Sequence, residues 1–396
     1  MALDRLRMTA PRWALLSAFA LVLSACSSAA TPERTGSTST LIQRESPSPN
    51  ALQSPSEWST FRFLASRIGT ANPDSGDPEQ VWTFDTGGIV ESSPAVVNGV
   101  VYVGTFAERL YALDATTGAE LWRFQVGGLL RASPSVVDSI VYFGADDDLF
   151  YAVDATTGDE IWRFQLGPGG EQSSPAIGSG LVWFGAFDRN VYALDASTGE
   201  EVWRFETGGG VLSSPAVVGD SLYIGSTDGV MYSLGAFTGD VNWRFQTDGP
   251  VFSSAAVSDN LVVFGSDDGR VHAVDAGSGE PRWSVQTGAP VFASPAIDQD
   301  TVYVGSRDGS FLAMNLLTGE VAWATDLVEV LSSAAVTPKR IYVGSSDGNL
   351  YVLNRTDGSV VTRLPVGASV WTSPAVVEGW LYFGAHDSNI HAYRLG

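Results

Sequence analysis

Short apolar segments alternate with turn residues along most of this chain, and the pattern repeats about every forty residues from Val81 to Gly396. One copy reads SSPAVVNGVVYVGTFAERLYALDATTGAELWRFQVGG. It contains four segments with the two-residue alternation and β-branched or aromatic composition of strands, separated by Gly, Asp, Asn and Thr. Because no stretch keeps a 3.6-residue apolar period for three turns, a helical solenoid is excluded. The pattern therefore predicts an all-β repeat protein.

The turn residues between the segments predict how the strands connect. The second and third segments meet at Asp-Gly pairs in four copies, as in Asp228-Gly229 and Asp268-Gly269. Asp-Gly favours a type I′ hairpin turn, in which both central residues have positive φ. The third and fourth segments meet at a Thr-Gly turn, as in Thr117-Gly118. Four antiparallel strands connected in this way form one blade of a β-propeller.

The register of the repeats predicts how the ring closes. The fourth-strand pattern occurs first at Val81–Asp85, before any complete copy, and the last copy ends with its third strand at Ile390–Arg394. Each of the four strand types occurs eight times. We therefore predict an eight-bladed propeller of four-stranded antiparallel blades, in which the N-terminal strand completes the last blade. This arrangement leaves no open seam in the ring.

Tryptophan marks the fourth strand in seven of the eight copies, whereas the seventh blade has Thr362 there. Trp122 and Phe124 should face one side of their strand, and Arg123 and Gln125 the other. One Trp side chain buries ~150–250 Å², so we expect this aromatic face to pack between adjacent blades. The joint after Thr362 should be the weakest. The predicted docking tryptophans are Trp82, Trp122, Trp162, Trp203, Trp243, Trp283 and Trp323.

The residues around each Trp resemble a known repeat. Ala112, Asp114, Gly118 and Trp122 have the spacing Ala-x-Asp-x-x-x-Gly-x-x-x-Trp, which recurs intact in three further copies. This spacing resembles the tryptophan-docking motif of pyrroloquinoline-quinone (PQQ)-type propeller repeats. Residues 58–69 are also similar to the lead-in that precedes many such propellers. The resemblance implies the same fold, with each Trp docked on a neighbouring repeat.

The N-terminal region has the features of a bacterial export signal. Residues 1–25 combine three arginines with an apolar stretch. The sequence Leu23-Ser24-Ala25-Cys26 resembles a lipoprotein lipobox, which implies lipidation of Cys26, the single cysteine of the chain. The alternative is a plain signal peptide with an incidental cysteine. We expect a signal peptide over 1–25, a disordered Ser/Thr/Pro-rich tether over 26–57, a lead-in over 58–80 and the propeller over 81–396.

Charge and composition exclude several functions. The net charge of −22 argues against nucleic-acid binding. Asp clusters such as 146–148 could attract Ca²⁺, but they fall where turn geometry itself favours Asp. His272 and His391 occupy a slot that is Tyr in other copies, so they should pack as aromatic rings, and no metal site is expected. PQQ-dependent dehydrogenases resemble this propeller but have long insertions and often paired cysteines. We therefore expect no enzyme, no catalytic residue and no cofactor.

One position varies between copies while its surroundings repeat. It precedes the "SSP" of the first strand, where the chain crosses to the next blade, so these side chains should ring one mouth of the central channel. Apolar groups rimmed by polar ones are typical of binding sites. The alternative is that they plug the channel. The eight residues of this predicted partner-binding rim are Glu91, Arg131, Gln172, Leu212, Phe252, Phe292, Leu331 and Trp371.

The combination of a lipobox and an eight-bladed PQQ-like propeller resembles the B lipoproteins of the outer-membrane β-barrel assembly machinery. This resemblance implies a non-enzymatic scaffold, anchored to the membrane by its lipid, that binds an envelope protein or peptide as a monomer. In a cell with two membranes it would lie on the periplasmic side of the outer membrane. The alternatives are a small-molecule or quinone binder related to quinoprotein dehydrogenases, and a carbohydrate- or peptide-binding module.

Overall fold

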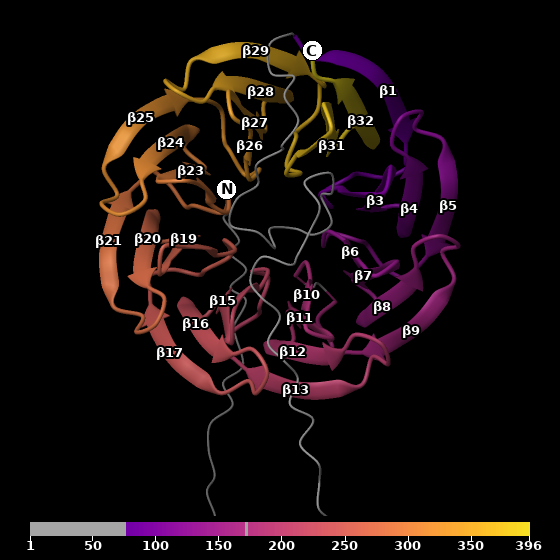
Figure 1. Cartoon of the computed structure of the whole chain (residues 1–396), viewed down its shortest axis with the longest axis horizontal. Helices are drawn as coiled ribbons and strands as arrows, with labels where there is room; N and C mark the ends of the chain where they lie inside the picture. Colours follow the sequence, from indigo (N-terminus) through magenta and orange to yellow (C-terminus); the bar gives the residue numbers. More distant parts are fainter. Residues whose placement is uncertain (1–76, 171–172) are drawn as a thin grey trace, which may run out of the picture. The chain divides into compact units, whose positions relative to one another are not determined.

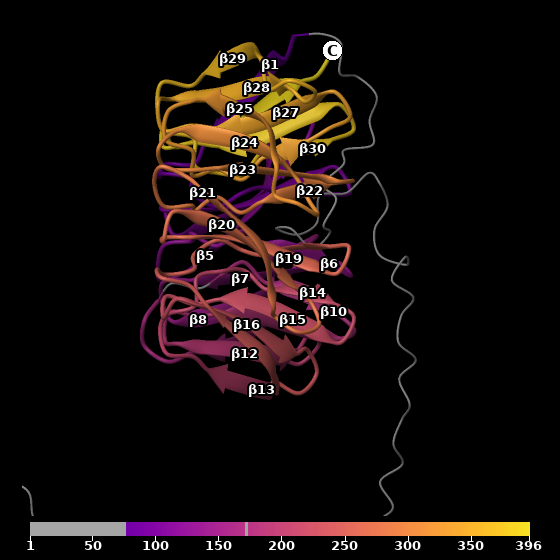
Figure 2. The ribbon, with the colours of Figure 1, turned by 90° about the vertical axis from the view of Figure 1, so that its left-hand side faces the viewer.

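A computed structural model of the protein describes residues 77–170 and 173–396, where the regular secondary structure consists of β-strands. The predicted signal peptide, the lipidated Cys26, the tether, most of the lead-in and Gln172 lie outside the described residues. The strands form eight four-stranded sheets. The sheets are arranged as blades around a central axis (Figure 1), and Figure 2 shows the same ring from the side. This confirms the predicted eight-bladed, all-β propeller.

Each blade has a short strand nearest the axis, two buried middle strands and an exposed outer strand (Figure 1). Blades 1 to 4 comprise β2 (Ala95–Val97), β3 (Val100–Thr105), β4 (Arg109–Asp114), β5 (Glu120–Gln125); β6 (Ser135–Val137), β7 (Ile140–Ala145), β8 (Leu149–Asp154), β9 (Glu160–Gln165); β10 (Ala176–Gly178), β11 (Leu181–Gly185), β12 (Asn190–Asp195), β13 (Glu201–Glu206); and β14 (Ala216–Val218), β15 (Ser221–Gly225), β16 (Val230–Gly235), β17 (Val241–Gln246). Blades 5 to 8 comprise β18 (Ala256–Ser258), β19 (Leu261–Ser266), β20 (Arg270–Asp275), β21 (Pro281–Gln286); β22 (Ala296–Asp298), β23 (Thr301–Gly305), β24 (Ser310–Asn315), β25 (Val321–Asp326); β26 (Ala335–Val336), β27 (Arg340–Gly344), β28 (Asn349–Asn354), β29 (Val360–Pro365); and β30 (Ala375–Val377), β31 (Trp380–Gly384), β32 (Asn389–Arg394) with β1 (Glu79–Asp85).

The last blade joins the two ends of the propeller. Strand β1 pairs antiparallel with β32, with Trp82 opposite Ala392 and Asp85 opposite Asn389. The sheet order is β1-β32-β31-β30, so the N-terminal strand is the outer strand of blade 8. The predicted closure is therefore confirmed, and no edge of the ring is left without a neighbouring blade.

The structure corrects the predicted turn type. In the hairpin between β15 and β16, Gly229 has φ 81°, but Asp228 is not among the residues with positive φ. The N–H of Gly229 donates to the carbonyl of Ser226, which closes a turn with only its last residue in the left-handed region. Two consecutive positive φ angles, as type I′ requires, occur instead in the hairpin between β2 and β3, at Asn98 (50°) and Gly99 (75°).

At the joint between blades 1 and 2, the Trp122 indole of one copy contacts Gly158 of the next copy. The indole Nε1 of Trp122 donates to the carbonyl of Ala155, 3.0 Å away. The hydroxyl of Tyr102 donates to the same carbonyl over 3.1 Å. A Cβ on Gly158 would lie 2.8 Å from the indole ring, and the φ of Gly158 is 76°. Only glycine therefore allows the indole to approach the backbone this closely. Asp154 holds this turn by accepting the N–H groups of Thr156 and Thr157.

The joint between blades 6 and 7 departs from this pattern. The Trp323 ring still contacts Gly358, but the hydrogen bond to the next blade is donated by Thr325 Oγ1 to the Gly358 carbonyl over 2.7 Å. Arg355 stands where blade 2 has Ala155, and its Nε donates to the hydroxyl of Tyr303 over 3.2 Å. Between blades 7 and 8, where Thr362 replaces Trp, Leu364, Tyr393 and Leu395 are buried in one apolar cluster. That this joint is the weakest stays a prediction.

Candidate functional site

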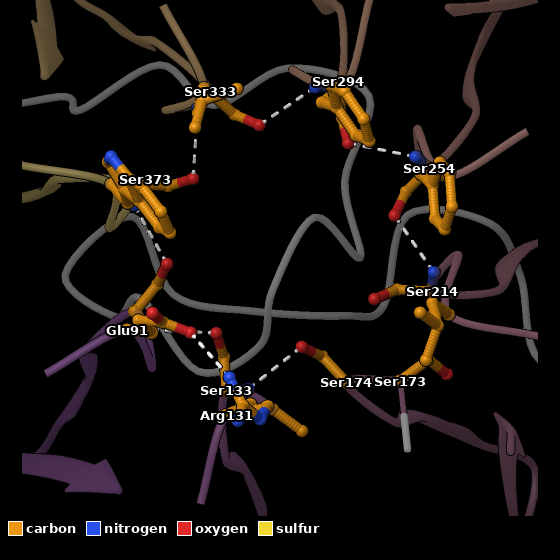
Figure 3. A pocket seen from close by; sticks show the side chains of 17 residues that line it. Glu91, Arg131, Ser133, Ser173, Ser174, Ser214, Ser254, Ser294, Ser333 and Ser373 are labelled. Carbon is orange, nitrogen blue, oxygen red and sulfur yellow. Dashed lines mark hydrogen bonds and ion pairs between the residues drawn. The ribbon is translucent and has the colours of Figure 1, made fainter. Parts of the chain in front are cut away.

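One buried serine from each blade forms a ring around the channel axis (Figure 3). The N–H of Ser93 donates to Ser133 Oγ over 2.9 Å, and the N–H of Ser373 donates to Ser93 Oγ over 2.8 Å. Each ring serine is at most 7% exposed, so these bonds satisfy backbone N–H groups that water cannot reach. Hydrogen bonds of this kind join seven of the eight neighbouring pairs. The ring serines are Ser93, Ser133, Ser174, Ser214, Ser254, Ser294, Ser333 and Ser373.

The "SSP" pattern in the sequence reflects two different bonds. In blade 1 the first serine, Ser92, accepts the N–H of Gly104 within its own blade over 3.1 Å. The second serine, Ser93, belongs to the ring and bonds across blades. The variable position, Glu91 in this blade, comes two residues before the ring serine. The repeat therefore fixes the backbone around the axis and leaves the side chain at this position free to vary.

The variable side chains gather at one cavity, whose volume is about 210 Å³. It is lined by the ring serines together with the seven described members of the predicted rim, which are Glu91, Arg131, Leu212, Phe252, Phe292, Leu331 and Trp371. Six of these side chains are half-buried, and Trp371 is 37% exposed. The structure thus brings the described rim residues to one mouth of the channel, whereas their role in binding a partner stays a prediction.

A second circle of variable residues surrounds the rim, and the sequence analysis missed it. These residues follow the second strand of each blade, four positions after the position that Tyr102 holds in blade 1 and Tyr382 holds in blade 8. The N–H of Phe106 donates to the carbonyl of Ile89, and that of His386 to the carbonyl of Ser369, which places both residues beside the rim. The internal alignment that found the rim would also have found this position. We call these residues the outer circle: Phe106, Asp146, Phe187, Thr227, Asp267, Arg307, Ser346 and His386.

A charged wall covers one side of the mouth. Arg131 Nη1 lies 3.2 Å from Glu91 Oε2, and Arg131 Nε lies 3.1 Å from Asp146 Oδ2. The guanidinium also lies over the Phe106 ring, 4.7 Å from its centroid. His386 Nε2 is 3.4 Å from Glu91 Oε1. Burial raises the pKa of Asp146, although the hydrogen bond from Arg131 opposes the shift. Rim and outer circle therefore form one connected network on this side.

An apolar wall faces the charged one across the cavity. Phe252 and Phe292 come from adjacent blades and stack with centroids 5.1 Å apart and planes at 30°. Leu212 and Leu331 extend this surface on either side. The guanidinium of Arg307 lies 5.4 Å from the centroid of Phe292, and its Nε donates to Glu329 Oε1 over 2.8 Å. The aromatic surface is thus held in place by neighbouring blades.

Trp371 stands between the two walls. Its Nε1 donates to Ser346 Oγ over 3.1 Å, and its ring lies 4.4 Å from that of His386. Both partners belong to the outer circle. The hydrogen bond and the ring contact orient an indole that remains accessible to a partner.

The histidines in the tyrosine slot are packed as the sequence suggested. His272 Nε2 lies 2.9 Å from Asp268 Oδ2, and the imidazole stacks on Phe264. In blade 2 the hydroxyl of Tyr151 donates to Asp147 in the same way, over 2.7 Å. In the described part of the chain, no three His, Cys, Asp or Glu side chains are grouped as a metal site would need. The same residues include no helix long and apolar enough to cross a membrane.

Solved structures with the same architecture come from proteins of different kinds. BamB from Moraxella catarrhalis is 21% identical, covers 81% of this chain and 98% of its own, and has a TM-score of 0.70. The computationally designed Ika8 protein is 18% identical, with 80% and 100% coverage and a TM-score of 0.73. A europium-containing methanol dehydrogenase is 14% identical, with 87% and 99% coverage and a TM-score of 0.76. At these identities the similarity establishes the fold alone.

The sequence itself carries the family assignment. No curated protein sequence matches the chain. One family profile, described as outer membrane protein assembly factor BamB, matches it four times, over residues 65–187, 151–253, 188–327 and 249–395. These matches extend without a gap from residue 65 to residue 395 of the 396. The chain therefore belongs to the outer membrane protein assembly factor BamB family.

Proposed function

We propose that this protein is a non-enzymatic scaffold of the cell envelope that binds a protein partner during the assembly of outer-membrane proteins. In this proposal it works as a monomer, anchored by lipid at Cys26 on the periplasmic side of the outer membrane. Membership of the BamB family supports the place and the process. The binding surface is the mouth formed by the rim and the outer circle.

The observation that carries the proposal is the contrast between a repeated scaffold and a variable mouth. Side chains that differ from blade to blade meet at one cavity, next to a ring of serines that hardly differs at all. Accessible aromatic and arginine side chains at the centre of such a surface usually dominate the energy of a protein interface. Phe252, Phe292, Trp371 and Arg131 have this character and this position.

The size of the cavity favours a protein partner over the small-molecule alternative. Sites for drug-sized ligands usually measure ~300–1,000 Å³. The cavity here is about 210 Å³. It therefore suits a projecting side chain better than a quinone cofactor. In the charged wall, Arg131 bridges Glu91 and Asp146. Because these charges are already paired, we expect them to orient a partner.

Crosslinking in native membranes tests the proposal. The tagged full-length protein is crosslinked in cells, and the captured proteins are identified by mass spectrometry. We expect components of the barrel-assembly machinery with the wild type and their loss with Phe252→Ala/Trp371→Ala. The control is Leu121→Ala/Val202→Ala, which alters two exposed apolar residues on outer strands. Equal capture of these components by the rim variant and the wild type would refute a role for the mouth.

The anchor needs a separate experiment, because Cys26 lies outside the described residues. A single acyl chain binds membranes weakly, whereas several chains make a stable anchor. We expect Cys26→Ala to remain unprocessed or to leave the membrane fraction, with the propeller still folded. A variant that fractionates with membranes as the wild type does, and has the same processed mass, would refute lipidation at this residue.

A further inference from the structure

The residues at the mouth restrict which type of partner side chain can enter the cavity. The inference that follows rests on the proposed function, in which a protein partner binds at the mouth. The cavity of about 210 Å³ is lined by an apolar wall on one side and by Glu91 and Arg131 on the other. The part of an occupant that enters the cavity must therefore combine an apolar body with a polar end, and the volume suits one large side chain. Lysine, arginine, tyrosine and tryptophan all meet this description.

The balance of charge separates the basic side chains from the neutral ones. Glu91 and Asp146 share the single guanidinium of Arg131. On the opposite side, Glu329 pairs with Arg307, while Asp267 Oδ1 is buried and makes no hydrogen bond within the described residues. These six side chains supply four carboxylates and two guanidiniums. The mouth, together with Glu329 beside it, therefore carries more carboxylates than guanidiniums, in a chain whose net charge is −22.

Burial makes this shortage more costly. It raises the pKa of Asp146 and that of Asp267, because both carboxylates are partly withdrawn from water. An added cation beside them would stabilise their ionised forms, whereas an added anion would do the opposite. Long-range attraction acts in the same direction, because a strongly acidic protein draws basic surfaces towards it.

The aromatic residues suit a cation as well. Two guanidiniums of this chain already lie over phenylalanine rings of the mouth, Arg131 over Phe106 and Arg307 over Phe292. Trp371, the best type of ring for this contact, is 37% exposed and held by Ser346. The aliphatic stem of a basic side chain would lie against Phe252 and Leu212 while its charged end meets Glu91.

We infer that the cavity holds one basic side chain, an arginine or a lysine, carried by a projecting segment of the partner protein. Glu91, which lines the cavity, binds its charge, while Asp146, paired with Arg131 nearby, adds to the negative potential. The apolar wall and Trp371 bind its stem. The remaining rim contacts the backbone of the segment around it. The inference names the chemistry of the contact and commits to a protein as its source.

Single-residue probes test this inference without the partner. The full-length protein, labelled with ¹⁵N at the tryptophan indoles, is titrated with Nα-acetyl-arginine methylamide, and the Trp371 signal is assigned with Trp371→Phe. The matched neutral probe is Nα-acetyl-citrulline methylamide, which keeps the shape of arginine without its charge. We expect the arginine probe to shift the Trp371 signal and to bind about tenfold more tightly than citrulline, a charge-assisted contact being worth that much. Added salt should reduce the difference.

Two variants, each of which removes one charge, test the charged wall. Glu91→Gln should weaken arginine binding, and Arg131→Gln should strengthen it, because it releases two carboxylates from their present partner. Both variants are compared only after their melting temperatures show that they fold. Equal binding of citrulline and arginine, stronger binding of Nα-acetyl-leucine or Nα-acetyl-tyrosine methylamide, or no shift of Trp371 with any probe would overturn the inference.

These outcomes are distinct from failure of the proposed function. If the rim variant loses the assembly components but the probes show no preference for charge, only the inference is wrong. If arginine binds at Trp371 but the rim variant captures the same components as the wild type, the proposed function is wrong and the cavity serves another basic ligand.

Discussion

The guanidinium of Arg355 in blade 7 forms an ion pair with the carboxylate of Asp298 in blade 6. Asp298 is 1% exposed. The corresponding joint between blades 1 and 2 brings together Val97 and Ala155. One joint thus places a buried ion pair at positions where another places two apolar side chains. A buried pair contributes little net stability, because the desolvation of both ions offsets their attraction, but removing one partner leaves an uncompensated charge.

The first prediction separates these two effects. Arg355→Leu alone should destabilise the protein by about 3–5 kcal/mol, because Asp298 is left buried without a counter-ion. The double variant Asp298→Val/Arg355→Leu should recover this loss and reach or exceed wild-type stability, since both residues then match those of other blades. Denaturant unfolding of the two variants and the wild type provides the measurement. A double variant as unstable as the single one would show that the pair is needed for more than its charge.

The second prediction concerns the close contact between glycine and tryptophan at each joint. Gly158→Ala forces a methyl group to 2.8 Å from the Trp122 indole and also strains a φ of 76°. Gly99→Ala has the same backbone strain, at φ 75°, but meets nothing within 4 Å. We expect about 1 kcal/mol of destabilisation for Gly99→Ala and about 1–3 kcal/mol more for Gly158→Ala. Equal melting temperatures of the two variants would show that the indole moves aside freely.

The third prediction tests the closure of the ring. Deletion of Val81–Asp85 removes the strand that pairs with β32 and the indole that donates to the Ala115 carbonyl. We expect a large fall in melting temperature and association through the bare edge of β32, detected by size-exclusion chromatography. Trp82→Ala serves as the partial change, since it keeps the strand and removes only the side chain. If the deletion variant has the melting temperature of the wild type and stays monomeric, β1 is not needed to close the ring.

The fourth prediction concerns pH. His391 is packed against Phe383 with its Nε2 3.0 Å from Asp387 Oδ2, and burial lowers its pKa from the usual 6.5. The folded protein therefore favours neutral imidazole, so this residue's contribution to stability is complete above about pH 6.5 and is lost as the pH falls through the lowered pKa. His391→Tyr places there the residue that pairs with Asp in other blades and does not titrate in this range. The difference in melting temperature between the variant and the wild type should grow in favour of the variant from about pH 7 to about pH 5. A difference that does not change with pH would show that His391 titrates alike in the folded and unfolded chain.

Much of this structure could be predicted because the chain aligns with itself. Eight copies of each strand type gave the number of blades, the closure and the rim at residues such as Glu91 and Phe252. The outer circle was missed because Asp146 was interpreted only as a residue that turn geometry favours, and the variation at its position was not compared between copies. The turn instead places that position beside Arg131. The pair of Asp298 and Arg355 occurs once, between residues of different blades, and no repeat pattern marks it.

The last prediction decides whether the aromatic side of the mouth binds a partner or merely fills the channel. Phe292 and Phe311 belong to the same repeat, but Phe292 is half-buried at the cavity and Phe311 is 0% exposed in the core. Phe311→Ala should cost about 3–5 kcal/mol, because it leaves a cavity that the blades cannot close. Phe292→Ala should cost about 1 kcal/mol or less, because water can replace the lost ring. Capture of the envelope partner should show the opposite order, with a loss for Phe292→Ala and normal capture by the folded molecules of Phe311→Ala. Phe311→Leu provides a milder core variant if Phe311→Ala does not fold. If Phe292→Ala instead melts as early as the core variant while its folded molecules still capture the partner, the ring is a structural plug, and the partner must bind elsewhere on the propeller.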